Sequence, residues 1–567
     1  MKIQHLIIVQ LLLLCLVITL VYSPAFRTEP CLLDDVSMLK GLQGEARLDL
    51  KSLLIPSSAN GSYYRPLIGV SYWSAQTLWH ADPRAMHAEN VVFHLLNVVL
   101  LFWLIRFSLP NEAQTRNYLP FLGALLFAVH PITTESVNWI SGRTDLIAGV
   151  CLFSGVIALV AWRNNRSRWW LFMLSLLMLA GAIMTKEVAW GFLAVLPFYL
   201  TDPHNSETFT LDRFLETFSR LEKLLLLTGI ALCFFLATLS LSFWPVIALS
   251  VVLGLITLYR KPRNHPLPKK TLILVPGMIL LGAILFPYGL QLAKQSASNG
   301  FYSKFSRTVL LISLDFDNSI GLFGSAFAFY IKKFFLPLPL SFAITGIAPE
   351  YLFAGIAIII LTAFLVVWRS PAAILFLTGL ALLLPALPLV HNQIAWTPYA
   401  ERYIYISTGF WIASLAVGLS SLNHPSMRIS CAAICMALIP VAALVSYNRS
   451  HIWQTNVALF GDTVQKSPNH LEARVLYMTA LSMAGRQPEA VEQFRRIQTD
   501  PRSWIRVKYF NDLADRLYND NLKHEAWEVL NSSMAISLPL GQKHPLKNDD
   551  WQKLYTFHSK LRKELFP

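Results

Sequence analysis

Apolar segments of roughly 17–22 residues recur along this chain of 567 residues, and each could cross about 30 Å of hydrocarbon as one α-helix. The composition agrees with this interpretation. Hydrophobic residues make up 54% of the chain and charged residues 14%, whereas soluble domains contain about 25% charged residues. The sequence therefore predicts an all-α polytopic membrane protein.

The net charge of +14 is concentrated in short loops between the apolar segments. Clusters of Lys and Arg in such loops are typical of the cytoplasmic side of membrane proteins. Phosphate binding by these loops is the alternative, but no nucleic-acid partner is expected. The residues concerned are Arg163, Arg166, Arg168, Arg260, Lys261, Arg263, Lys269 and Lys270.

The first apolar segment, Leu6 to Tyr22, follows Lys2 without a small-residue cleavage site, which favours a retained signal anchor with its N-terminus inside. We expect external segments over about 24–85 and 291–350, a transmembrane domain over 1–447 and a tail over 448–567. About 11–13 helices fit this length, and an odd number would place the tail outside. After the first, the expected helices span 87–106, 118–131, 144–162, 168–184, 187–200, 223–241, 243–259, 271–290, 351–368, 371–390, 403–421 and 428–447.

Ionisable residues gather on the expected outer side, at or beside helix ends. Asp34 and Asp35 follow the first helix directly, and the others come from separate parts of the chain. Charged groups at one membrane level indicate a functional site, and the alternative is that each is a solvated loop charge. The further members are Arg65, Glu135, Arg143, Asp145, Lys186, Glu187, Glu401 and Arg402.

This set of residue types suits transfer of a sugar from a lipid phosphate to a hydroxyl. A carboxylate, Asp34 or Asp35, could accept the proton of the hydroxyl as the new bond forms. Cations could bind the phosphate leaving group and offset its charge; the candidates are Arg65, Arg143, Lys186 and Arg402. Attack from the face opposite the phosphate would invert the anomeric centre. The sequence leaves open whether these groups converge.

Several short blocks in order resemble GT-C fold glycosyltransferases, and more specifically the transmembrane-and-TPR (TMTC-type) protein O-mannosyltransferases and their bacterial relatives. The first carries the acid pair, and the most specific begins at Phe127. The resembling blocks are Leu32-Leu33-Asp34-Asp35, Tyr64-Arg65-Pro66-Leu67, Phe93-His94-Leu95-Leu96-Asn97, Phe127-Ala128-Val129-His130-Pro131 with Glu135, Gly142-Arg143 and Asp145, Lys186-Glu187, and Arg402-Tyr403-Ile404-Tyr405 with Gly409-Phe410.

The tail after residue 448 has a TPR-like pattern of paired helices, with positions such as Trp453, Gly485, Ala490 and Phe494. There is room for two or three units, fewer than in the long arrays of eukaryotic family members. An extended peptide-binding superhelix is therefore in doubt. Because two repeats rarely stand alone, we expect a small helical cap that packs on the outer loops.

The resemblance implies a polyprenyl- or dolichyl-phosphate-linked sugar donor and a Ser or Thr hydroxyl of an exported protein as acceptor, with membrane lipids as surroundings. It gives the base role to Asp34, while Asp35 would position the acceptor or share the proton. Lys186 and Arg402 would contact the phosphate. The cavity would be lined by Glu135, His130, Asp145, Glu187 and Glu401.

Some assignments have structural or chemical alternatives. A divalent cation could bind the Asp pair with a nearby Glu, although no cofactor is certain. His130 precedes Pro131 at a helix end and could instead satisfy backbone groups, and His94 with Asn97 could lock helix packing through hydrogen bonds.

Two other functional classes remain open. One is a GT-C transferase that modifies lipid A or a polysaccharide, and the other is a transporter or scaffold. The short tail favours a bacterial inner-membrane protein with its active face and tail in the periplasm; in a eukaryote these would face the ER lumen.

Overall fold

The computed structural model is mostly helical. It describes residues 2–44, 65–110, 117–165, 167–200, 308, 310–391, 395–422, 424–500, 502–503, 507–537 and 548–566. Within these ranges, β-structure is limited to one isolated bridge between Ile344 and Tyr399. The all-α prediction is therefore confirmed. The helices expected at 223–241, 243–259 and 271–290, and the basic cluster at 260–270, lie outside the described residues.

Among the described residues, seven helices or helix pairs are long and apolar enough to cross a membrane. This confirms an integral multi-pass membrane protein, and the boundaries match most of the expected ones within a few residues. The seven are α1 (Lys2–Val21), α5 (Pro83–Ser108), η4 with α8 (Ile140–Gly142, Arg143–Asn164), α17 (Tyr351–Trp368), α18 with η7 (Pro371–Ala381, Leu384–His391), η8 with α19 (Glu401–Ile404, Tyr405–Ser420) and α20 (Pro425–Trp453). Shorter apolar helices are α6 (Leu119–Ala128), α9 (Trp169–Ile183) and η5 with α10 (Glu187–Gly191, Phe192–Leu200).

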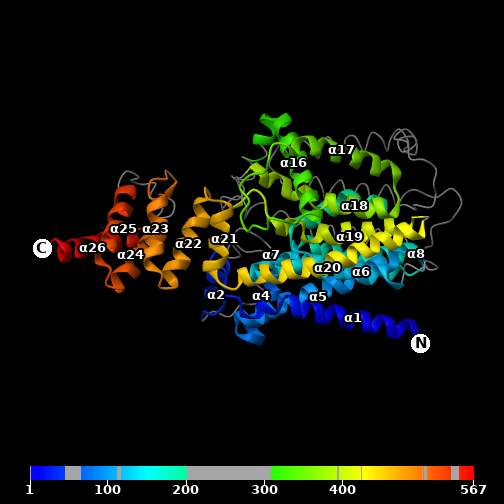
Figure 1. Cartoon of the computed structure of the whole chain (residues 1–567), viewed down its shortest axis with the longest axis horizontal. Helices are drawn as coiled ribbons and strands as arrows, with labels where there is room; N and C mark the ends of the chain where they lie inside the picture. Colours follow the sequence, from blue (N-terminus) through cyan, green and yellow to red (C-terminus); the bar gives the residue numbers. More distant parts are fainter. Residues whose placement is uncertain are drawn as a thin grey trace.

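Helix α5 packs against α1, α6, α8 and α19 inside this bundle (Figure 1). Polar side chains join these helices where they meet: the His94 ring lies 2.8 Å from the Tyr405 hydroxyl, and the Asn97 amide donates to the Leu146 carbonyl at 2.8 Å. A Cβ at Gly149 would lie 2.7 Å from Asn97 Oδ1, so glycine permits this close approach. His94 and Asn97 therefore lock helix packing, as the sequence suggested.

Helix α16 (Phe316–Phe335) lies within the segment that the sequence assigns to an external loop. Its residues Phe329, Tyr330 and Phe334 belong to the main hydrophobic core, and it packs along α17. The polar residues Asp315 and Lys332 at its two ends explain why hydropathy alone does not identify it.

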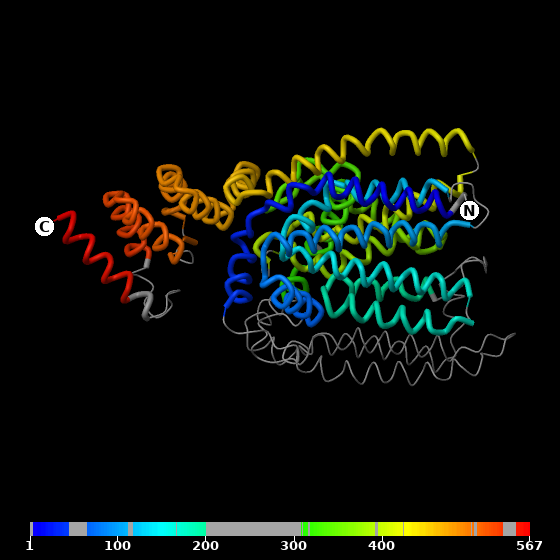
Figure 2. Tube along the Cα trace, turned by 90° about the horizontal axis from the view of Figure 1, so that it is seen from below, coloured from blue at the N-terminus to red at the C-terminus, as the bar shows by residue number. Residues whose placement is uncertain are grey.

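Helix α20 extends to Trp453, beyond the expected boundary, and leads directly into the tail. Consecutive tail helices pack on one another around a separate core that includes Met478, Phe494 and Phe510. The tail extends from one end of the bundle, and the N-terminus lies at the opposite end (Figure 2). The tail helices are α21 (Asn456–Lys466), α22 (Leu471–Met483), α23 (Gln487–Ile497), α24 (Val507–Asn519), α25 (Lys523–Ser537) and α26 (Asn548–Leu565).

An aromatic cluster joins the tail to this end of the bundle. The Phe342 ring lies 4.8 Å from Trp453, 4.9 Å from Trp396 and 5.5 Å from Trp139, measured between ring centroids. Burial of such rings contributes about 1.5–3 kcal/mol for each large side chain. The first tail helices are thereby held against the loops at the end of the bundle.

Candidate functional site

The acid pair lies where the chain turns between the bundle and the tail. Helix α2 (Asp35–Leu42) follows α1 and the short helix η1 (Ser23–Arg27), and Asp34 is the residue immediately before it. Asp35 lies in the first turn of α2, where a negative charge is favoured by the helix dipole. Figure 1 places α2 at the tail end of the bundle.

Asp35 is fully buried, and both of its oxygens are used by the fold. Oδ1 accepts hydrogen bonds from the backbone N–H of Ser141 at 3.0 Å and from its hydroxyl at 2.5 Å, and Oδ2 accepts one from the Cys31 N–H at 3.1 Å. Burial raises the pKa of Asp35 to about 6, and these hydrogen bonds oppose the rise. Asp35 therefore ties the segment before α2 to helix η4.

Asp34 differs from its neighbour because its side chain is exposed. Its carboxylate makes no hydrogen bond or ion pair with the described residues and does not cap α2. Loss of water around the carboxylate raises its pKa above the ordinary value, and the charge of Arg402 acts in the opposite direction. Asp34 is therefore an available carboxylate within the electrostatic range of a guanidinium.

Arg402 is held in a buried pair with Glu135, which lies on the short helix α7 (Thr133–Asn138). Its Nη1 donates to Glu135 Oε1 at 2.5 Å, and its backbone N–H donates to Oε2 at 3.0 Å. The guanidinium carbon lies 5.1 Å from the Trp139 ring centroid and 4.9 Å from that of Tyr403. These contacts fix the orientation of the Arg402 charge.

Two further ion pairs lie beside this one. The Lys186 ammonium donates to Asp145 in the first turn of α8, and Arg65 contacts Glu187 through two bonds of 2.6 and 3.2 Å. Burial lowers the pKa of Lys186, Asp145 raises it, and the charges of Arg402 and Arg65 lower it further. Because the charges of Arg402 and Arg65 both act on Lys186, these three cations lie in the same part of the site.

Arg143 is placed differently from the other three candidate cations. Its side chain is completely buried, lies 3.2 Å from the Glu89 carboxylate and donates to the Met86 carbonyl at 3.2 Å. The guanidinium also lies over the Tyr72 ring. Arg143 thus holds α5 and α4 (Pro66–Trp79) against α8, and a phosphate would have to displace these contacts to reach it.

His130 and Glu401 are also engaged by the backbone around them. His130 Nδ1 accepts from the Ile132 N–H at 3.3 Å, so its Nε2–H donates to the Phe334 carbonyl at 3.0 Å. Glu401 Oε1 accepts from the Ser341 N–H at 2.9 Å and from the Lys333 ammonium at 2.8 Å. Both ring nitrogens of His130 thus bond to backbone groups, as in the structural alternative, and Glu401 anchors the loop before the aromatic cluster.

Two residues outside the set of site residues predicted from the sequence support the site. Lys333 is buried against Glu401, and its spacing of four residues from Phe329 on the buried face of α16 is a signal that could have identified it. Asn456 at the start of α21 contacts the segment before Asp34. No sequence spacing could indicate that contact.

The described residues do not include a group of three or more His, Cys, Asp or Glu side chains arranged to hold a metal ion. The oxygens of Asp35 are already occupied by Ser141 and Cys31, so the acid pair does not fit a divalent cation as it stands.

Comparison with known proteins shows a sequence similarity to one group of enzymes. No protein-family model matches the chain, and no solved structure matches it. It is 30% identical over 136 residues to the protein O-mannosyl-transferase Tmtc1 of Drosophila melanogaster, which is 24% of this chain and 15% of that protein. The similar proteins are TMTC-type protein O-mannosyltransferases.

Two mouse relatives extend the comparison. The identity to TMTC1 is 37% over 95 residues, and that to TMTC2 is 31% over 155 residues. These matches cover 17% and 27% of this chain and 10% and 18% of the relatives. The chain therefore spans less than a fifth of the length of the TMTC proteins that it matches. Over these matched residues, the resemblance indicated by the sequence motifs is confirmed.

Proposed function

We propose that this chain is a GT-C type glycosyltransferase that moves mannose or another hexose from a polyprenyl-phosphate donor to hydroxyl groups of exported proteins. The observation that carries the proposal is the state of the Asp34 carboxylate, which is exposed. Of the six carboxylates expected at the site, it alone has no hydrogen bond or ion pair with the described residues. It also lies within the electrostatic range of Arg402. A general base needs an oxygen that can reach the proton it accepts, and the exposed Asp34 carboxylate offers one.

In the proposed reaction, the Asp34 carboxylate accepts the proton of a Ser or Thr hydroxyl. The hydroxyl oxygen forms a bond to the anomeric carbon of the sugar while the bond from that carbon to the phosphate oxygen breaks. The electron pair of the broken bond leaves with the polyprenyl phosphate, and the proton passes from Asp34 to solvent. Because attack and departure occur on opposite faces, the anomeric configuration is inverted.

The departing phosphate gains negative charge, and the positive charges of Arg402, Lys186 and Arg65 offset it. Arg402 and Lys186 are held by Glu135 and Asp145, which orients both before a donor binds. Arg65 is the most exposed of the three, with a quarter of its side chain accessible. A preorganised donor of this kind typically contributes about 10²–10³-fold to kcat.

The protein acceptor is supported by the names of the relatives, which are protein O-mannosyl-transferases. It is also supported by the tail, which lies at the same end of the bundle as α2 (Figures 1 and 2). We assign this end to the outer face of the membrane, the periplasm in a bacterium. A lipid-linked sugar can be presented there, whereas nucleotide sugars remain inside.

The test supplies purified protein in detergent with labelled polyprenyl-phosphate mannose or glucose and an extract of exported proteins. Wild type should transfer label to protein, and Asp34→Asn should lose at least about 10²-fold of that rate. Glu350→Gln, at another exposed acid, is the matched control and should retain it. Equal transfer by Asp34→Asn would contradict the mechanism. Label on lipid A or polysaccharide instead of protein, or a requirement for a nucleotide sugar, would contradict the function.

A further inference from the structure

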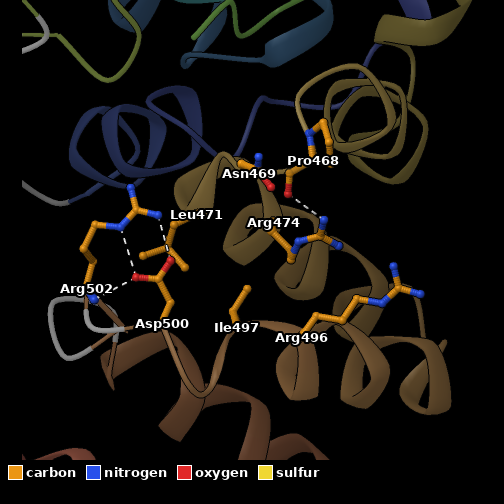
Figure 3. Close-up of a pocket in the computed structure, with 8 residues that line it drawn as sticks. All are labelled: Pro468, Asn469, Leu471, Arg474, Arg496, Ile497, Asp500 and Arg502. Carbon is orange, nitrogen blue, oxygen red and sulfur yellow. Dashed lines mark hydrogen bonds and ion pairs between the residues drawn. The ribbon is translucent and has the colours of Figure 1, made fainter.

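A cavity of about 300 Å³ lies in the tail, where the turn before α22 meets the end of α23. The guanidinium groups of Arg474 and Arg496 lie on one side of it, and the Asp500–Arg502 pair lies on the other (Figure 3). Two apolar side chains, Leu471 and Ile497, lie between these groups. The complete lining consists of Pro468, Asn469, Leu471, Arg474, Arg496, Ile497, Asp500 and Arg502.

Arg474 is a buried charge whose partners are neutral. Only 8% of the residue is exposed. Its Nη1 donates to Gln493 Oε1 and its Nη2 to the Pro468 carbonyl, both at 2.7 Å. Among the described residues, it forms no ion pair with a carboxylate. A buried guanidinium without a counter-charge is unfavourable, so the cavity beside it is suited to an anion.

Two carboxylates near the cavity, Asp500 and Glu492, are already engaged. Asp500 accepts two hydrogen bonds from the Arg502 guanidinium, at 3.0 and 2.7 Å, and one from the Arg502 backbone N–H at 2.8 Å. Glu492 contacts Arg496 at 2.6 Å. Burial lowers the pKa of Arg474, and the charge of Arg496 lowers it further. The two guanidinium groups lie on the same side of the cavity (Figure 3), and an anion placed beside both would relieve their repulsion.

We propose that this cavity binds an acidic side chain of a polypeptide, with the carboxylate between Arg474 and Arg496 and a neighbouring apolar side chain on Leu471 and Ile497. A lipid headgroup is the poorer occupant, because α22 and α23 lie beyond the end of the bundle (Figures 1 and 2). The proposal rests on the proposed function in one respect: the bound polypeptide is the acceptor, which the tail holds near the Asp34 end of the bundle.

The first experiment measures binding of a fluorescein-labelled peptide of alternating Asp and Leu to the full chain in detergent, by fluorescence anisotropy. A matched peptide with Asn in place of Asp is the ligand control. Wild type should bind the acidic peptide at least about tenfold more tightly, since bonds between charged groups are roughly twice as strong as neutral ones. Arg474→Gln and Arg496→Gln should each remove most of this difference.

Arg486→Gln is the matched protein control, because Arg486 is an exposed tail arginine that pairs with Glu489 away from the cavity. It should bind the acidic peptide as wild type does. Arg496 is exposed, so its substitution keeps the test valid if Arg474→Gln fails to fold, as judged by thermal unfolding. Equal binding of the two peptides, or unchanged binding by Arg496→Gln, would overturn the proposal. Displacement of the acidic peptide by inorganic phosphate at concentrations where acetate has no effect would assign the cavity to phosphate instead.

A second experiment separates this proposal from the proposed function. Transfer of label is compared between acceptor peptides with and without acidic residues near the Ser or Thr. Arg474→Gln and Arg496→Gln should raise KM for the acidic acceptor about tenfold and leave kcat unchanged, because the cavity contacts no reacting atom. If Asp34 is needed for transfer but neither arginine affects KM, the cavity proposal fails and the function stands. If no transfer occurs but binding depends on Arg474 and Arg496, the function fails and the cavity proposal stands.

Discussion

Asn456 accepts a hydrogen bond from the backbone N–H of Leu32 at 3.0 Å, across 424 positions of the sequence. The same side chain donates to the Pro30 carbonyl at 3.0 Å, and its backbone N–H donates to the Glu29 carboxylate at 3.0 Å. Asn456 of helix α21 is therefore hydrogen-bonded to the segment that leads to Asp34. The tail thereby helps to fix the position of the proposed base.

Asn456→Ala should lower kcat by roughly 10- to 100-fold with little change in KM for the donor, because a displacement of the base by about 1 Å has effects of this size. Sugar transfer by purified protein measures both constants. Asn531→Ala, at an exposed asparagine of α25, is the control and should behave as wild type. A variant that loses donor affinity while kcat is unchanged would contradict a positioning role for Asn456.

Asp35 should make stability depend on pH in the opposite sense to an ordinary salt-bridged acid. Its pKa is raised from 3.8 to about 6 in the folded state, so between these values the folded protein binds more protons than the unfolded chain. Stability should therefore fall as pH rises from about 4 to 6, by roughly 3 kcal/mol at most. The unfolding temperature in detergent, measured at steps of pH, reports this slope.

Asp35→Asn removes the ionisable group and should abolish that part of the slope. It also replaces the acceptor of the Cys31 N–H with an amide donor, which should reduce stability by about 1–3 kcal/mol. Asp34→Asn should keep the wild-type slope and unfolding temperature while transfer is lost. An equal loss of stability in the two variants would contradict the division between a structural and an available carboxylate.

Sequence patterning could predict the helices and the membrane class but not the roles within the acid pair. Asp34 and Asp35 are chemically identical neighbours, and what separates them is Ser141, which lies 106 positions away. Likewise, Arg143 and Arg402 look equivalent as helix-end arginines, yet one is enclosed by Glu89 and Met86 while the other lies within range of Asp34. Such distinctions depend on tertiary contacts that spacing does not encode.

Lys333 and Glu401 form a buried ion pair outside the proposed chemistry, and its role can be tested separately. Lys333→Met should destabilise the protein by about 3–5 kcal/mol, because it leaves the Glu401 carboxylate buried without its cation. Lys333→Met combined with Glu401→Gln should recover most of this stability, as thermal unfolding would show. Recovery of stability together with wild-type transfer would assign the pair to the fold alone, and persistent loss of transfer would instead add Glu401 to the site.

Arg402 and Glu135 allow stability to be separated from chemistry at the proposed phosphate site. Arg402→Gln should lower kcat by about 10²–10³-fold if its charge stabilises the departing phosphate. The single variant also leaves Glu135 buried without its cation, so an additional loss of stability of about 3–5 kcal/mol is expected. Unfolding temperature and transfer rate must therefore be measured on the same preparations.

The double variant Arg402→Gln with Glu135→Gln resolves the two effects, because two neutral amides can pair in the place of the two charges. It should regain most of the unfolding temperature but none of the lost kcat, since the cation beside Asp34 is still missing. Arg402→Lys keeps the charge and loses the planar contacts with Trp139 and Tyr403, so it should retain part of the activity. Recovery of transfer in the double variant would show that Arg402 serves the fold and that Lys186 and Arg65 alone suffice for the phosphate.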